Sequence, residues 1–290
     1  MLYSSTYLQK IRFFLLAAAW GAPAALAHEF WLEPPRFRLQ PGDTAPVRPL
    51  VGEGFRGEPW TNKASKIRRL VRYGPAPADS TDLTPAPAAG PADTFATRFA
   101  FARPGTHVVC LQSTESFIEL PADQFAAYLK EEGLDNALKL RQTAGQATLP
   151  GREAYRRCAK ALVQAGPAAA ADTAYRRVLG LPLELVPEQN PYRLAAGRSL
   201  TVRVLRAGQP ARGALVRVWQ RQPNPQLPSY FATRANQNGR LLLHLSGPGP
   251  YLLAAVQMEA APAALRARAD WLSTWASLTF AGPPAAGRQR

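Results

Sequence analysis

The sequence predicts a mainly β protein, because short segments of alternating apolar and polar residues recur through most of the chain and are separated by turns that contain Gly and Pro. The pattern changes to helical spacing only in a central stretch, and the 290 residues are enough for two domains. We therefore predict two immunoglobulin-like β-sandwich domains, over residues 28–120 and 183–290, joined by a helical insertion or connector over residues 121–182.

The first 27 residues have the pattern of a cleavable signal peptide. Lys10 and Arg12 precede the apolar run 13–20, and residues 25–27, Ala-Leu-Ala, form the small-x-small triplet that signal peptidase accepts. The run is shorter than the roughly 20 apolar residues that a membrane-spanning helix needs. We expect export to the periplasm, no transmembrane span in the mature chain, and His28 as its first residue.

The first predicted domain consists of short strands and turns. A Pro-, Ala- and Asp-rich span over 75–93 has little to bury and is expected to be a loop. Segments 94–101 and 106–112 alternate on either side of Arg103-Pro104-Gly105, which is typical of a β-hairpin. The remaining strands of this domain are expected at 37–39, 47–51 and 67–73.

The central stretch is expected to hold three helices. Asp123 can cap a helix that ends at Gly133, and a second helix follows from Leu134. Apolar residues with helical spacing over 155–163 suggest a third helix, which ends near Gly166. The second domain follows with the strong tight-turn signal Asn238-Gly239. Its strands are expected at 200–205, 214–219, 240–245, 251–258 and 271–280.

The charge and cysteine content narrow the function classes. The chain carries 35 Lys and Arg against 20 Asp and Glu, a net charge of +15, but the basic residues are spread in Arg pairs without the aromatic-studded basic stripe of a nucleic-acid site. A solvated surface, or attraction to anionic surfaces, explains the excess of basic residues instead.

The chain has two cysteines, of which Cys110 lies in a strand-like run and Cys158 in the helical pattern. The sequence is compatible both with a disulfide between them and with two buried thiols. Their spacing matches no CxxC motif.

The three histidines define the candidate metal ligands. His28 is special because a terminal residue offers both its amine and its ring Nδ1 to one metal ion, such as Ni²⁺ or Cu²⁺. His107 is the best second ligand if a metal is bound, and the alternative is a core or edge histidine with satisfied hydrogen bonds. His244, between leucines, is expected to be structural. Glu29 and Glu53 are possible carboxylate ligands, Glu53 because glycines on both sides leave it unshielded.

No catalytic motif is present. The sequence contains no GxSxG, HExxH or phosphate-binding glycine loop. Metal affinity is expected to fall as the pH drops, because the amine and imidazole must lose protons to coordinate.

Several segments spread over the mature chain carry a resemblance to a known family. They are His28-Glu29-Phe30-Trp31-Leu32-Glu33-Pro34, Val51-Gly52-Glu53, Phe117-Ile118-Glu119-Leu120-Pro121, Asn190-Pro191-Tyr192 and the segment 271–280. With these segments the chain resembles a bacterial periplasmic family of unknown function whose members are often described as nickel or cobalt uptake accessory proteins. The resemblance implies an exported module that captures or presents nickel, cobalt or copper, with a metal-uptake transporter or outer-membrane receptor as partner. One position departs from the family, which often has His where this chain has Gln257.

Three functions are therefore considered. The first is a non-enzymatic periplasmic metal-binding protein that uses His28, with His107, Glu29 and Glu53 as further ligands. The second is a metal-free partner-binding or adhesion β-sandwich, since fold alone does not fix function. The third is a copper-dependent polysaccharide oxygenase, with Trp31 and Trp60 as aromatic platforms. Proximity of His28 to His107 would favour the first.

Overall fold

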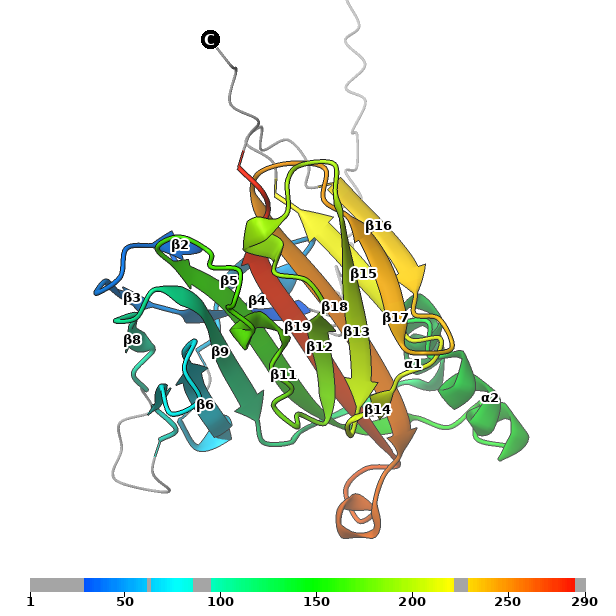
Figure 1. The fold of residues 1–290 in the computed structure, drawn as a ribbon. Helices are drawn as coiled ribbons and strands as arrows, with labels where there is room; N and C mark the ends of the chain where they lie inside the picture. The colour runs from blue at the N-terminus through cyan, green and yellow to red at the C-terminus, as the bar shows by residue number, and fades with distance from the viewer. Residues whose placement is uncertain (1–28, 62–63, 86–94, 222–228, 285–290) are drawn as a thin grey trace, which may run out of the picture.

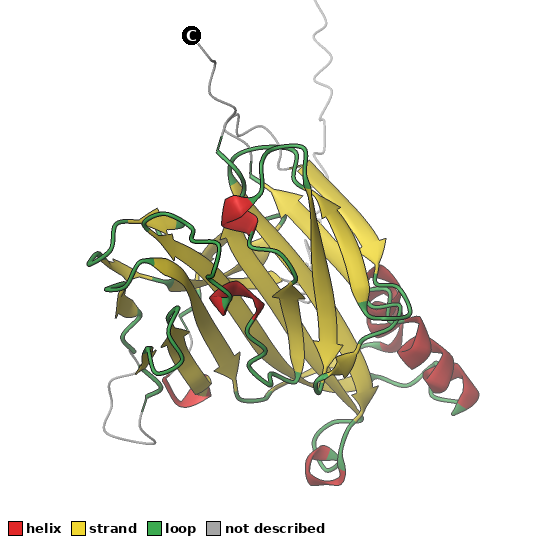
Figure 2. Cartoon of the chain, viewed as in Figure 1, coloured by secondary structure: helices red, strands yellow, loops and turns green. Residues whose placement is uncertain are grey.

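The computed structural model describes residues 29–61, 64–85, 95–221 and 229–284 (Figure 1). The predicted fold class is confirmed, because strands dominate the described chain and form packed sheets (Figure 2). Two α-helices, α1 (Ala122–Glu131) and α2 (Asp135–Thr143), lie together at one side of the molecule in Figure 1. None of the helices in the described ranges has the length and apolar character to cross a membrane.

The largest sheet has ten strands, and we call it the main sheet. Eight strands follow one another across it, and two short strands pair with β11. In spatial order the eight are β16 (Ser229–Arg234), β15 (Leu215–Gln220), β18 (Pro250–Ala260), β19 (Trp271–Ala281), β11 (Gly151–Ala165), β9 (Gly105–Ser113), β6 (Ile67–Tyr73) and β7 (Ser80–Asp82). The two short strands are β2 (Arg38–Leu39) and β10 (Ser116–Leu120).

Three smaller sheets complete the described structure. A four-stranded sheet contains β12 (Leu183–Pro187), β13 (Ser199–Arg206), β14 (Gln209–Pro210) and β17 (Arg240–His244). A three-stranded sheet contains β1 (Glu29–Glu33), β4 (Arg48–Glu53) and β5 (Arg56–Pro59), and a two-stranded sheet contains β3 (Thr44–Pro46) and β8 (Arg98–Ala100). Short 3₁₀ helices lie at η1 (Ala64–Lys66), η2 (Ala174–Arg176), η3 (Pro191–Arg193) and η4 (Ala263–Leu265).

The four-stranded sheet covers one face of the main sheet. Leu185, Val204 and Leu243 belong to the same apolar cluster as Val218 and Leu278 of the main sheet. All five side chains are buried, and burying each stabilises the fold by roughly 1.5–3 kcal/mol. This face-to-face packing is the sandwich arrangement that alternating strands predict.

The opposite face of the main sheet carries β1 and α1. Phe125 and Leu129 of α1 pack with Val256, Met258 and Trp271. Alternation along β18 explains this division, because Val256 and Met258 point away from the face that Leu253 presents to the four-stranded sheet. Helix α1 ends as predicted, with Gly133 at a φ of 64° just past its end.

The third predicted helix is wrong, because residues 151–165 form the long strand β11. This strand hydrogen-bonds to β9 on one side and to β19 on the other, and every residue from Cys158 to Ala165 is buried. A strand that is covered on both faces has a continuous apolar run, and periodicity cannot distinguish such a run from a buried helix.

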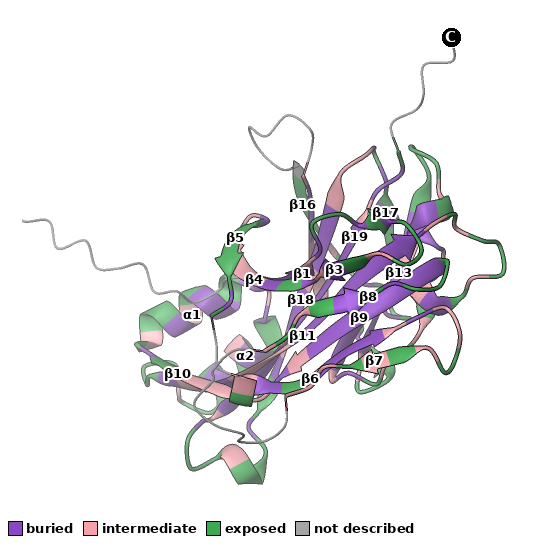
Figure 3. Ribbon diagram, turned by 90° about the vertical axis from the view of Figure 1, so that its left-hand side faces the viewer, coloured by how far each residue is buried: buried purple, intermediate pink, exposed green. Residues whose placement is uncertain are grey.

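The predicted hairpin over 94–112 is also wrong. Its first half contributes β8, which pairs with β3, whereas its second half is β9, which pairs with β6 and β11. Figure 3 shows β9 buried along most of its length. The turn chemistry of Arg103-Pro104-Gly105 was read correctly as a change of direction, but tertiary packing selects the strand partners.

Strands from all three predicted segments share the main sheet. The junction is a parallel pairing of β11 with β19, in register from Glu153 opposite Trp271 to Ala161 opposite Thr279. The domain boundaries themselves stay a prediction. In the structure, strands from residues 28–120, 121–182 and 183–290 are hydrogen-bonded to one another in a single sheet.

Both cysteines are buried free thiols in the structure. Cys158 lies on β11 and not on a helix. Burial raises the pKa of Cys110 to about 11 and that of Cys158 to about 12, so neither is a thiolate at neutral pH.

Candidate functional site

Strand β1 and the β4–β5 hairpin form the frame of the candidate site. Strand β1 pairs with β4 from Glu29 opposite Gly52 to Glu33 opposite Arg48. His28 lies outside the described residues, so the described part of the site begins at Glu29. The frame therefore places Glu29, the first described residue, opposite Gly52 near the end of β4.

The tip of the hairpin is fixed by a buried aromatic residue. Phe55 adopts a φ of 63°, a conformation that is costly for a bulky side chain, and it contacts Trp31 with ring centroids 5.6 Å apart. Arg221 holds the tip, since its Nη2 donates to the Phe55 carbonyl at 2.9 Å and its Nη1 donates to Glu33 at 2.8 Å. The left-handed turn is stabilised by these contacts.

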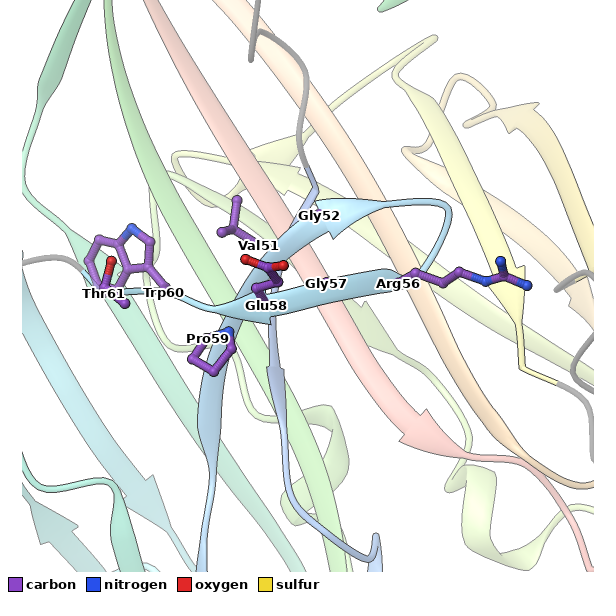
Figure 4. Close-up of a pocket in the computed structure, with 8 residues that line it drawn as sticks. All are labelled: Val51, Gly52, Arg56, Gly57, Glu58, Pro59, Trp60 and Thr61. Atoms are coloured by element: carbon purple, nitrogen blue, oxygen red, sulfur yellow. The ribbon is translucent and has the colours of Figure 1, made fainter.

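A shallow hollow of about 840 Å³ lies along the hairpin (Figure 4). Trp60 lies at one end of it and Arg56 at the other in Figure 4. Strand β5 is exposed along its length, as Figure 3 shows. The aromatic residues near the hollow offer no open face to a sugar, because Trp31 is fully buried and Trp60 is 9% exposed.

Glu29 is a buried carboxylate with an unsatisfied oxygen. Its side chain is 8% exposed, and its Oε2 has no hydrogen-bond partner among the described residues. Burial raises its pKa to about 7, while the backbone N–H groups of Glu29 and Gly54 and the guanidinium of Arg217 act in the opposite direction. A buried polar atom without a partner is rare in a folded protein, and a protonated carboxyl group, a water molecule or an ion can account for it.

Glu132 and Arg217 form an ion pair, and both charges act on the pKa of Glu29, which Arg217 lowers and Glu132 raises. Arg217 Nη1 donates to Glu132 Oε2, and its Nη2 donates to the carbonyl oxygen of Glu131 at 2.6 Å. Burial raises the pKa of Glu132, although Arg217 lowers it. We call Glu29, Glu132 and Arg217 the Glu29 cluster.

Glu53 is placed on a different face of the hairpin from Glu29. Gly52 is the register partner of Glu29, and side chains alternate along a strand, so Glu53 points to the other side. Glu53 is the last residue of β4 and pairs with Arg56 of β5 in the register of the hairpin. The structure therefore does not bring Glu29 and Glu53 to one face.

His107 is fully buried in a hydrogen-bonded network. Its Nε2 lies 2.8 Å from the Arg103 carbonyl oxygen, which can only accept, so Nε2 carries the proton. Its Nδ1 lies 3.0 Å from Arg72 Nη1 and accepts from it. Burial lowers the pKa of His107, and Arg72 lowers it further, which keeps the ring neutral. Both ring nitrogens are engaged, so neither is open to a metal in this arrangement.

His244 lies on β17 and is exposed. Among the described residues, no three or more His, Cys, Asp or Glu side chains are gathered so that they could hold a metal ion. Glu29, whose Oε2 has no hydrogen-bond partner among the described residues, follows His28 directly in the sequence.

A second buried acid was missed by the sequence analysis. Glu153 Oε1 accepts from Tyr128 at 3.2 Å and from the hydroxyl of Ser273, which in turn accepts from Trp275 Nε1 at 3.1 Å. Burial raises the pKa of Glu153 to about 7, and nearby Glu132 raises it too. The sequence around Glu153 carries no local signal for this network, because the hydrogen-bond partners of Glu153 are distant in sequence.

The comparisons with known proteins identify a family and no function. The family model described as "Domain of unknown function (DUF4198)" matches residues 25–259. No curated protein matches the chain.

Two solved structures show a distant likeness. Trypsin-activated alpha-2-macroglobulin from Escherichia coli is 10% identical, with 90% of this chain and 16% of that chain covered and a TM-score of 0.23. The three N-terminal domains of the bacteriophage RB49 highly immunogenic outer capsid protein are 10% identical, with 87% of this chain and 59% of that chain covered and a TM-score of 0.18. The chain therefore spans about a sixth of the first structure, and neither TM-score supports an argument.

Proposed function

The chain belongs to the DUF4198 domain family, and from that premise we propose that it is a non-enzymatic periplasmic protein that binds a divalent transition metal, nickel, cobalt or copper. The ligands would be the amine and Nδ1 of His28 and the carboxylate of Glu29. The protein would serve metal uptake or homeostasis, with a metal-uptake transporter or outer-membrane receptor as partner.

One observation carries the proposal. Glu29 presents a buried carboxylate oxygen that no described residue satisfies, and Glu29 directly follows the residue that cleavage after Ala27 would make terminal. A cation next to that oxygen would compensate the cost of burying it. Imidazole, amine and carboxylate donors together suit borderline divalent cations.

His107 is left out of the proposed ligand set, because Arg72 and Arg103 occupy its ring nitrogens. Glu53 is kept as an alternative carboxylate ligand, since it follows Gly52, the register partner of Glu29, on β4. The polysaccharide oxygenase is not proposed, because Trp31 and Trp60 are buried and provide no platform.

Calorimetry on two forms of the chain tests the proposal. One form begins at His28, and the other begins at Ala25, so that the α-nitrogen of His28 is an amide and cannot close the chelate ring. We expect 1:1 binding of Ni²⁺, Co²⁺ or Cu²⁺ to the first form and at least a tenfold weaker affinity for the second. Glu29→Gln should also weaken binding.

The matched control is His244→Gln, which removes an exposed imidazole on β17, a strand of a different sheet from β1. It should leave the affinity unchanged. Equal affinity of the two forms for every metal would overturn the proposal. Retained affinity in Glu29→Gln together with a loss in Glu53→Gln would replace Glu29 by Glu53 as the carboxylate ligand.

A further inference from the structure

The segment that carries both α-helices, residues 121–150, leaves the main sheet and returns to it at one point. It follows Leu120, the last residue of β10, and precedes Gly151, the first residue of β11. These two residues are register partners in the antiparallel pair of β10 with β11. No strand of the described structure includes a residue of the segment. The segment is therefore hinged on the sheet, and lifting it breaks no pair of strands.

Helix α1 covers the sheet through an interface with a polar centre. The ring of Phe125 lies directly on the hinge, since a Cβ added at Gly151 would be 2.2 Å from Phe125 Cγ. The ring of Tyr128 stacks on Trp275 of β19, with centroids 6.2 Å apart. The hydroxyl of the same tyrosine donates to Glu153 Oε1 at 3.2 Å. One face of α1 therefore encloses both aromatic contacts and an acid.

Glu153 is enclosed without a cation. The two hydrogen bonds to its Oε1 come from neutral hydroxyl groups, those of Tyr128 and Ser273. Its register partners on β10 and β19 are Ile118 and Trp271, which are apolar. Among the residues that the structure describes, no ion pair includes Glu153. A charge on this carboxyl group would therefore be buried without compensation while α1 is in place.

The other titratable groups at this interface do not supply that compensation. Glu132, just after the end of α1, is itself acidic and raises the pKa of Glu153. Arg217 of β15 bonds to Glu132 and to the Glu131 carbonyl oxygen. Burial raises the pKa of Tyr128 well above its ordinary value, so its hydroxyl stays a neutral donor. Burial of Glu153 raises its own pKa to about 7, which places its ionisation close to neutral pH.

We propose that segment 121–150 is a hinged cover of the main sheet, and that loss of the Glu153 proton makes it open more often. The neutral carboxyl group accepts from Tyr128 at no cost in buried charge. The carboxylate gains hydration only when the cover lifts, so ionisation favours the open form. The pair of Leu120 with Gly151 keeps both ends of the segment in place during this motion.

Opening uncovers an apolar part of the main sheet. Val256, Met258 and Trp271 are buried in one cluster with Phe125 and Leu129 of α1, and lifting the helix exposes both sides of this contact. The cost of that exposure keeps the open form a minor population at every pH. Rising pH therefore increases the fraction of time for which this apolar surface is accessible.

Hydrogen exchange of the backbone amides of α1 tests the inference. Protection factors, corrected for the intrinsic exchange rate, should fall by up to about 70-fold between pH 5 and pH 8, as expected for a pKa that rises from 4.5 to about 7 on closure. The α1 amides should be less protected at both pH values than those of Leu162 and Leu278 in the main sheet, because the opening is local. In Glu153→Gln the fall should be at least tenfold smaller.

Two further variants serve as controls. Asp135→Asn removes an exposed carboxylate of α2, which pairs with Arg234 at 2.9 Å, and should leave the pH dependence unchanged. Gly151→Ala pushes Phe125 off the hinge and should lower the protection of α1 at both pH values while keeping their ratio. It tests the hinge independently if Glu153→Gln does not fold.

Three results would overturn the inference. One is equal protection of the α1 amides at pH 5 and pH 8, and another is an equal fall in Glu153→Gln and the unchanged chain. The third is equal protection of the α1 amides and those of Leu162 and Leu278, because α1 would then open only in global unfolding. None of these measurements involves a metal, so the proposed function is tested separately.

Discussion

Burial sets the protonation of the histidine that the sequence favoured as a second ligand. His107 has a pKa below its ordinary value of 6.5, mainly because charging it would place a cation in the interior beside Arg72. The folded chain therefore binds fewer protons at this site than the unfolded chain. Its stabilising contribution is present above about pH 6.5 and is lost as the pH falls below that value.

Nuclear magnetic resonance titration of the His107 ring measures this directly. We expect a midpoint below 6.5 and the Nε2–H tautomer throughout the neutral range, because Nε2 donates to the Arg103 carbonyl oxygen. A midpoint at or above 6.5 would show that the ring is exposed or faces an anion, and would restore His107 as a candidate ligand.

Glu153 shows the opposite linkage. Its pKa of about 7 lies above the ordinary 4.5, so the folded chain binds more protons than the unfolded chain between these values. The free energy of unfolding should therefore fall as the pH rises from about 4.5 to about 7, by up to about 3 kcal/mol from this group.

The substitution Glu153→Gln keeps the shape of the side chain and removes its titratable carboxyl group. Urea denaturation at pH 5 and pH 8 should show a smaller loss of stability for the variant than for the unchanged chain. The free energy of unfolding of the variant should still fall somewhat between pH 5 and pH 8, because Glu29 also has a raised pKa, about 7. An equal loss of stability between pH 5 and pH 8 in the variant and the unchanged chain would contradict a raised pKa for the buried Glu153.

At the scale of single residues, the sequence pointed to Glu29 but not to its surroundings. Glu29 was identified because it follows a terminal histidine, which is local information. Glu132 and Arg217 were missed because they are 85 positions apart and meet only through the packing of α1 on the sheet. Long-range pairs of this kind leave no periodic signal in one sequence.

The β4–β5 hairpin depends on a glycine that lies under an aromatic ring. A Cβ added at Gly57 would lie 2.5 Å from Trp31 Cη2 and 2.6 Å from the Val51 carbonyl oxygen. Backbone cannot yield as a flexible side chain can, so the strand would have to move away from β4.

Gly57→Ala should therefore destabilise the protein by about 1–3 kcal/mol, the cost of overpacking. Gly247→Ala is the matched control, because a Cβ there meets nothing within 4 Å. Thermal or urea denaturation checks both variants. A neutral Gly57→Ala would mean that the hairpin does not rest on Trp31 as the structure has it.

At the scale of elements, the sequence predicted the helix ends and turns that depend on a few neighbouring residues. Gly133 ends α1 as expected, and Asn238-Gly239 forms a turn with the Gly239 N–H bonded to the Asn236 carbonyl oxygen at 2.9 Å. Strand β11 was missed because burial on both faces erases the alternation of period two. Its partners β9 and β19 are set by tertiary packing.

At the scale of the whole molecule, the parallel pairing of β11 with β19 connects parts of the chain that the sequence assigned to different segments. This junction joins strands from the predicted insertion and from the second sandwich in one sheet, with nine residue pairs in register. Separate unfolding of either half would expose the apolar residues on both of these strands, such as Leu162 and Leu278. Such exposure is costly at about 25 cal/mol per Å².

We therefore expect one cooperative unfolding transition in differential scanning calorimetry, with the calorimetric and van't Hoff enthalpies in agreement. Two resolved transitions would contradict the joint core and would support independent domains with the predicted boundaries.

The most direct test of the account is calorimetric metal titration of the chain that begins at His28 against the chain that begins at Ala25. We expect 1:1 binding of nickel, cobalt or copper that is at least tenfold tighter when the amine of His28 is free. Equal affinities, or no binding by either form, would contradict it.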